Sequence, residues 1–281
     1  MCSEAVYLVA RELIRQDEIY AAIWVILQFD ICGREQDVEC LFPADIVQSG
    51  GEYALVFGVS ARGETVKTGR DQGAVIEQPW VGRLVMALAE RTPVGARIFP
   101  LTQEGFRRRW AAALTSLGLP FRPPHALRHT AAAEAIFQKR LSLEQVRRRG
   151  RWKALSSVQR YTKTHDIVNY KGSMDPQLLA EGEQLLKDLP KHFQTELGSR
   201  PGELSAALAC AVGGEVQTST TCTTADGEGG NLVKRTVAEL RAMCRSKNLA
   251  VTGKKADLIE RLRGHNVADG DDSCEDGWEG R

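Results

Sequence analysis

The charge of this chain is divided unevenly along its length, and this division constrains both how the chain can fold and what it can bind. Residues 1–104 carry nine Lys and Arg against fifteen Asp and Glu, whereas residues 105–165 carry fourteen against two. The net charge of +1 for the whole chain conceals the contrast. Because a solvated helix face normally mixes the two signs, a basic surplus of this size favours contact with a nucleic acid. The alternative is that some of these arginines pair with the acidic N-terminal part.

Inside the basic stretch, groups that bind phosphate precede a single tyrosine. His125 and Arg128 are three residues apart, so on a helix they share one face. Arg128 offers a planar fork of donors that fits two phosphate oxygens at once. Tyr161, with an ordinary pKa of about 10, is ionised only about once in a thousand at neutral pH. It therefore needs neighbouring cations or a base to become a nucleophile, and the surrounding residues predict covalent cleavage of a DNA strand.

In these residues the chain resembles the catalytic domain of the tyrosine recombinases, the phage integrase family. The family pattern opens with Gly-Arg, an acidic residue, a leucine and Asp-Ile at fixed spacing, which correspond here to Gly33, Arg34, Asp37, Leu41 and Asp45-Ile46. The pattern continues with a lysine in a β-hairpin, His-x-x-Arg-His, a His or Trp position and the nucleophile nine residues later. These positions are Lys67, residues 125–129, Trp152 and Tyr161.

The resemblance implies a role for each of these side chains. Arg34 and Arg128 would clamp the nonbridging oxygens of the scissile phosphate and stabilise the charge that grows in the transition state. Lys67 would protonate the leaving 5′-oxygen, with His125 assisting the proton transfer. Attack by Tyr161 would leave a 3′-phosphotyrosine that conserves the bond energy, so that rejoining needs no ATP, no metal and no small-molecule cofactor.

Two aromatic residues near the motif have less direct expected roles. Trp152 can donate only its indole N–H, to a phosphate oxygen or to a group that holds the site. His129 is expected on the helix behind Arg128, where a packing role is favoured over direct chemistry. His165 has no matching position in the family pattern.

The C-terminal part resembles a second family, the SAP motif, a helix-extended loop-helix module of chromatin and DNA-repair proteins. Thr236 to Glu239 form a capping box, and the family's apolar and basic positions are met by Val237, Leu240, Leu249, Gly253-Lys254-Lys255 and Leu258-Ile259-Glu260-Arg261-Leu262. The resemblance implies DNA binding and a nuclear setting. The alternative is that Lys254 and Lys255 merely solvate the start of a helix. The residues predicted to contact DNA are Arg147, Arg148, Arg149, Arg151, Lys254, Lys255 and Arg261.

The periodicity of apolar residues predicts an α+β catalytic domain that is mainly helical, with a small three-stranded sheet, followed by the SAP module. Strands are expected at 45–48, 53–59 and 74–77, and helices at 3–29, 79–90, 102–117, 125–140, 142–149 and 156–164. Thr102 and Ser142 are the expected N-caps. The expected domains are a catalytic domain at 1–170, a partly helical and then flexible linker at 171–230, the SAP domain at 231–266 and an acidic tail at 267–281.

The sequence also excludes several classes of protein. The longest apolar stretch, at 19–29, is too short to cross a bilayer, and no secretory signal is apparent. The seven cysteines lack Cys-x-x-Cys spacing, which predicts reduced thiols and no zinc site.

The motifs leave the activity open. The recombinases usually have a separate helical DNA-clamping domain before the catalytic one, and fewer than forty residues precede Arg34. We expect DNA recombination or integration, with a homo-oligomer on DNA. The missing clamp leaves open a truncated or domesticated copy of a mobile element, or a chain that needs a partner to recombine DNA. The two alternatives are a type IB topoisomerase-like enzyme and a catalytically inactive, domesticated chromatin-binding protein.

Overall fold

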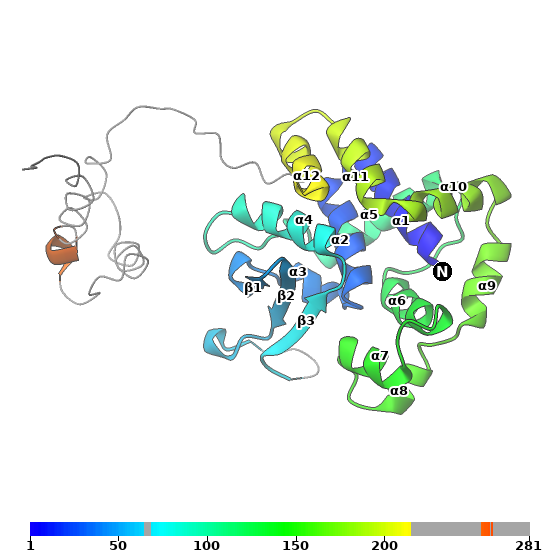
Figure 1. The fold of residues 1–281 in the computed structure, drawn as a ribbon, viewed down its shortest axis with the longest axis horizontal. Coiled ribbons are helices and arrows are strands. Elements are labelled where there is room, and N and C mark those ends of the chain that lie inside the picture. The colour runs from blue at the N-terminus through cyan, green and yellow to red at the C-terminus, as the bar shows by residue number, and fades with distance from the viewer. Residues whose placement is uncertain (65–68, 215–253, 259, 261–281) are drawn as a thin grey trace, which may run out of the picture. The chain divides into compact units, whose positions relative to one another are not determined.

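The structure is a computed structural model that describes residues 1–64, 69–214, 254–258 and 260. The chain divides into two compact units, Met1–Thr218 and Ser219–Arg281. The described part of the first unit is mainly helical and contains one small antiparallel sheet, as the sequence predicts (Figure 1).

The first unit has the following elements in chain order. They are α1 (Ser3–Arg15), α2 (Ile19–Asp30), α3 (Glu35–Glu39), the 3₁₀ turn η1 (Pro43–Asp45), β1 (Ile46–Ser49), β2 (Glu52–Phe57), the 3₁₀ turn η2 (Ser60–Arg62), β3 (Gln72–Ile76), α4 (Pro79–Glu90), α5 (Gln103–Ser116), α6 (Ala126–Phe137), α7 (Leu143–Arg149), α8 (Leu155–Gln159), α9 (His165–Gly172), α10 (Pro176–Lys187), α11 (Leu189–Gly198) and α12 (Glu203–Gly213).

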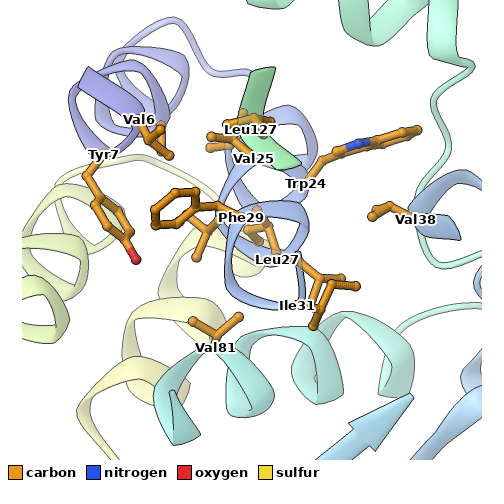
Figure 2. Close-up of a cluster of buried hydrophobic side chains, with 14 of the residues drawn as sticks. Val6, Tyr7, Trp24, Val25, Leu27, Phe29, Ile31, Val38, Val81 and Leu127 are labelled. Carbon is orange, nitrogen blue, oxygen red and sulfur yellow. The ribbon is translucent and has the colours of Figure 1, made fainter. Parts of the chain in front are cut away.

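Helix α2 forms the centre of the core and contacts α1, α4, α5 and α6. A helix that is apolar on every side must be buried, and nearly every side chain of α2 is. Figure 2 shows its residues Trp24 and Phe29 pointing in opposite directions, with Tyr7 of α1 beside the Phe29 ring. Trp24 stacks on Phe106 of α5 with ring centroids 4.6 Å apart. In the part of the chain that the structure describes, no helix combines the length and the apolar character that crossing a membrane requires.

The single helix predicted over 3–29 is in fact two helices. Asp17 has a left-handed backbone with φ of 61°. Its N–H donates to Ile14 O at 3.0 Å, and the N–H of Glu18 donates to Leu13 O at 2.8 Å. This is the Schellman arrangement that ends a helix, so α1 and α2 pack on each other as a pair.

The sheet has the order β1-β2-β3, with Tyr53 of β2 opposite Gln48 and Ile76. Its buried face carries Leu55, and Val75 lies on the exposed face, as period-two alternation requires. Helix α4 crosses the buried face so closely that a Cβ at Gly82 would lie 2.2 Å from the Tyr53 ring. Gly82 is therefore required where α4 meets the sheet.

Helices α10–α12 belong to the first compact unit, although the sequence places a domain boundary at residue 170. They pack on α1 and α4. Gly182 lies against α1, where a Cβ would lie 2.7 Å from that of Glu4, and Arg83 of α4 donates from Nε to Ala211 O at 2.7 Å. The sequence pattern does not predict α12 at all. The apolar faces of these helices are buried against the N-terminal helices, which explains why residue 170 is not the end of the unit.

Candidate functional site

Five of the six residues predicted for catalysis line one pocket of about 600 Å³, which we call the site pocket. They are Arg34, His125, Arg128, Trp152 and Tyr161. The sixth, Lys67, falls in the connection between β2 and β3 and lies outside the described residues. The pocket thus gathers side chains from segments that are far apart in the chain, and helices α6, α7 and α8, which carry or flank most of them, are neighbours in the fold (Figure 1).

Arg34 is positioned by the way in which α2 ends. Cys32 has a left-handed backbone with φ of 52°, and the N–H of Gly33 donates to Gln28 O at 2.8 Å, which closes the helix. The Arg34 N–H donates to Asp37 Oδ2 at 2.9 Å, and its Nη1 is 3.9 Å from the same oxygen. That Nη1 is buried and has no hydrogen-bond partner among the described residues, so it can donate to an oxygen of a ligand.

Arg128 is buried, with 1 % of its surface exposed. Its Nη1 donates to Cys32 O at 2.6 Å and its Nη2 to Gly150 O, which ties the turn after α2 to the end of α7. Burial lowers the pKa of Arg128 to about 10, with Arg34 and Arg151 acting in the same direction. The guanidinium therefore stays charged at neutral pH. No carboxylate lies within ion-pair distance of it in the described part of the chain.

Trp152 is brought against Arg128 by the end of α7. The N–H of Arg151, whose φ is 55°, donates to Arg148 O, and the N–H of Trp152 donates to Arg147 O, both at 3.0 Å. This second Schellman arrangement turns the Trp152 ring under the Arg128 guanidinium, whose Cζ is 4.1 Å from the ring centroid. A Cβ at Gly150 would lie 1.7 Å from this ring, so only glycine fits there.

Tyr161 does not lie on a helix, because the helix predicted over 156–164 occurs only as α8, Leu155–Gln159. Helix α8 ends at Gln159, and the Tyr161 N–H donates to Val158 O at 2.7 Å in a single 3₁₀-like turn. The following Thr162 and Thr164 are β-branched and have low helix propensity. The tyrosine therefore sits on a short connection before α9.

Three rings surround the tyrosine. Its centroid is 4.1 Å from that of His129, 5.3 Å from that of Trp152 and 6.1 Å from that of His125. Burial, and then the neighbouring His125 and Arg128, lower the pKa of His129 to about 4. His129 is therefore neutral at pH 7 and packs on the Tyr161 ring, in agreement with the packing role expected for it.

The sequence interpretation missed other residues of the site pocket. Lys153 and Arg160 line it beside Trp152 and Tyr161, together with Gln103 from the start of α5. The position of Lys153 and Arg160 next to motif residues was an available signal. The carbonyl groups that hold Arg128 had no sequence signal, because every residue carries one.

The four arginines predicted to bind DNA near α7 divide into two pairs. Arg147 and Arg148 both pair with Glu144 at the surface, and the Arg148 side chain is 76 % exposed. Arg149 instead pairs with Glu77 and donates to Asp30 O, and Arg151 pairs with Asp37 in a contact whose two side chains are 7 % and 3 % exposed. Arg149 and Arg151 therefore hold the fold together, and the expected alternative of pairing with the acidic N-terminal part applies to them.

Of the residues predicted to bind DNA in the second unit, Lys254 and Lys255 are described and Arg261 lies outside the described residues. The Lys254 N–H donates to Asp257 Oδ2 at 2.8 Å, at the start of a helical turn over 255–258. The Lys254 side chain is exposed and that of Lys255 is half-buried.

Comparisons with known proteins bear on this second unit. The family model described as SAP domain matches residues 231–266, and this match implies nucleic-acid binding. No curated protein and no solved structure matches the chain. The recombinase resemblance of the first unit therefore rests on its own residues and their geometry.

Proposed function

We propose that this protein cleaves and rejoins DNA strands through a 3′-phosphotyrosine on Tyr161, as in site-specific recombination or integration, with the SAP segment tethering it to DNA in the nucleus. The observation that carries the proposal is the convergence of five predicted residues on the site pocket. The five residues occur in the order and with the residue types of the family pattern. They also line one pocket, although their positions span residues 34 to 161.

The electrostatics of the site pocket support the same chemistry. A buried charge without a carboxylate partner is costly, and such charges occur where a ligand supplies the partner. Arg128 meets this description, and the Nη1 of Arg34, which has no hydrogen-bond partner among the described residues, adds a second donor. Together they suit a phosphate, whose nonbridging oxygens gain charge in the transition state.

In the proposed reaction the phenolic oxygen of Tyr161 attacks the scissile phosphorus, and the bond from phosphorus to the 5′-oxygen breaks. The Tyr161 proton leaves with the help of His125, and Lys67 protonates the departing 5′-oxygen. Rejoining reverses both steps, so that no bond energy is lost.

The test is a suicide substrate, in which a nick near the cleavage position lets the short product diffuse away and traps the protein on DNA. Because the target sequence is unknown, the nicked duplexes carry randomised sequence, and the adduct is detected as a band that resists denaturation. We expect Tyr161→Phe to abolish the adduct while DNA affinity stays within about twofold, since only a hydroxyl is removed.

Tyr170→Phe is the matched control. The Tyr170 hydroxyl donates to Pro120 O at 3.1 Å, and burial raises its pKa to about 12, so this variant should still form the adduct. An adduct that persists in Tyr161→Phe would move the nucleophile elsewhere.

The second candidate function is a DNA- or chromatin-binding protein without catalysis, and the SAP match favours it directly. Such a protein would retain the randomised duplexes and form no adduct. A type IB topoisomerase-like enzyme would form the adduct and relax supercoiled plasmid by itself without joining two sites.

A further inference from the structure

A second pocket is also lined by Tyr161. It has a volume of about 320 Å³ and is formed by Met1, the loop before α6, α6, the connection between α8 and α9 and the start of α9. His125, Arg160 and Tyr161 line both this second pocket and the site pocket. The two pockets therefore adjoin at these three side chains.

The second pocket is basic. Arg122, Arg160 and Lys163 line it, and Asp166 is its one carboxylate among the lining residues that the structure describes. Asp166 Oδ1 is 3.3 Å from His165 Nε2, which offsets part of its charge when that histidine is protonated. A concave surface with cations of one sign concentrates anions.

His129 lines the second pocket, so the pKa of its imidazole responds to the charges around that pocket. After burial, the neighbours that lower its pKa are, in decreasing order, His125, Arg128, the N-terminal ammonium of Met1 and Lys163. An anion placed here would meet favourable charge and a neutral imidazole that can donate one hydrogen bond.

We propose that the second pocket binds a phosphate of the DNA backbone, the neighbour on the same strand of the phosphate in the site pocket. This assignment rests on the proposed function for the identity of the site pocket. Successive phosphates of a strand are one nucleotide apart, and the two pockets adjoin, since His125, Arg160 and Tyr161 line both. Backbone phosphate contacts fix the register of a protein on DNA, so this contact sets which phosphate faces Tyr161.

The test measures the pKa of the His129 imidazole by NMR, in the full chain carrying Tyr161→Phe so that no covalent chemistry occurs. The probe is a duplex of about two helical turns of mixed sequence at saturating concentration, and a His129→Gln variant assigns the signal. A phosphate beside the ring favours its charged form, so the duplex should raise its pKa by about one pH unit or more. No rise with saturating duplex overturns the proposal.

Two lysine variants distinguish the pockets. Lys163 lines the second pocket but not the site pocket, and Lys153 lines the site pocket but not the second pocket. The rise caused by the duplex should persist in Lys153→Gln and fall by at least about half in Lys163→Gln, where the phosphate is held less closely. An equal rise in both variants would assign the effect to the site pocket and overturn the proposal.

Inorganic phosphate without DNA provides the last arm. A rise in the pKa of His129 with inorganic phosphate but not with the duplex would make this a free-phosphate site and overturn the DNA assignment. Because none of these measurements needs cleavage, a failure to find the covalent adduct would sink the proposed function and leave this test intact.

Discussion

Arg128 and Arg151 are both buried beside the ends of α2 and α7, yet their guanidinium groups have different kinds of partner. Arg151 is ion-paired with Asp37, and its Cζ lies 4.2 Å from the Phe57 ring centroid. Arg128 instead donates to two backbone carbonyls and has no ion-paired carboxylate in the described part of the chain. A compensated buried charge holds a structure together, whereas an uncompensated one beside a pocket is available to a ligand.

The prediction with the largest expected effect concerns the stability that the pair of Arg151 and Asp37 provides. Replacing Arg151 with Gln removes the closer of the two guanidinium groups that pair with the buried Asp37 and leaves only the Arg34 guanidinium, 3.9 Å away, among the described residues. The free energy of unfolding should therefore fall by about 3 to 5 kcal/mol. Denaturant unfolding followed by circular dichroism measures it. Arg148→Gln, on the exposed face of α7, is the control and should change stability by less than about 0.5 kcal/mol. Equal stability of both variants would mean that the Asp37 pair does not hold the fold.

The next prediction concerns Arg34 and Arg128, the two arginines proposed to bind the phosphate in the site pocket. Arg34→Ala removes from the site pocket a donor that has no hydrogen-bond partner among the described residues, so cleavage of saturating suicide substrate should slow by roughly 10² to 10³, about 3 to 4 kcal/mol. The same reduction is expected for Arg128→Ala, whose two carbonyl contacts also position the turns. Single-turnover cleavage measures the rate, under conditions in which circular dichroism shows each variant to be folded. An unchanged rate would remove Arg34 from the catalytic group.

Local rules accounted for much of the fold. Thr102 and Ser142 are the N-caps, with side chains that accept from the N–H groups of Gly105 and Gln145, and the three strands occur near their predicted positions. Short-range hydrogen bonding and apolar alternation are written in neighbouring residues, which is why sequence alone reaches them.

Contacts between residues far apart in the chain explain the features that the sequence did not predict. Arg151 and Asp37 are 114 residues apart, so a run of arginines gave no sign of which ones turn inward. The Tyr161 ring packs on His129 of α6, and this contact outweighs the helix expected around it. The residue types of the site were predictable from their resemblance, whereas the pocket beyond Tyr161 depended on the fold.

A smaller effect sharpens the contrast between the two units. Deleting residues 231–281 should weaken DNA binding and flatten its salt dependence, because each phosphate that the protein no longer neutralises lowers the slope of log affinity against log salt by about 0.9. Cleavage at saturating DNA should survive, since the site pocket lies wholly in the first unit. Affinity measured by fluorescence anisotropy over a range of salt tests this. An unchanged slope would favour protein interaction over DNA tethering for the SAP segment.

The smallest expected effect is on the salt dependence of DNA binding. It distinguishes Arg148 at the surface from Arg149 and Arg151, which pair with carboxylates of the N-terminal part. The Arg148 side chain is 76 % exposed, and its one ion-pair partner among the residues that the structure describes is the surface carboxylate of Glu144, a pairing that solvent and salt weaken. If Arg148 contacts a phosphate, Arg148→Gln should reduce the salt slope by about 0.9. Lys187→Gln on α10, whose ammonium donates to Gln184 at 2.8 Å, is the matched surface control and should leave the slope unchanged. Equal slopes for the two variants would remove Arg148 from the residues that contact DNA.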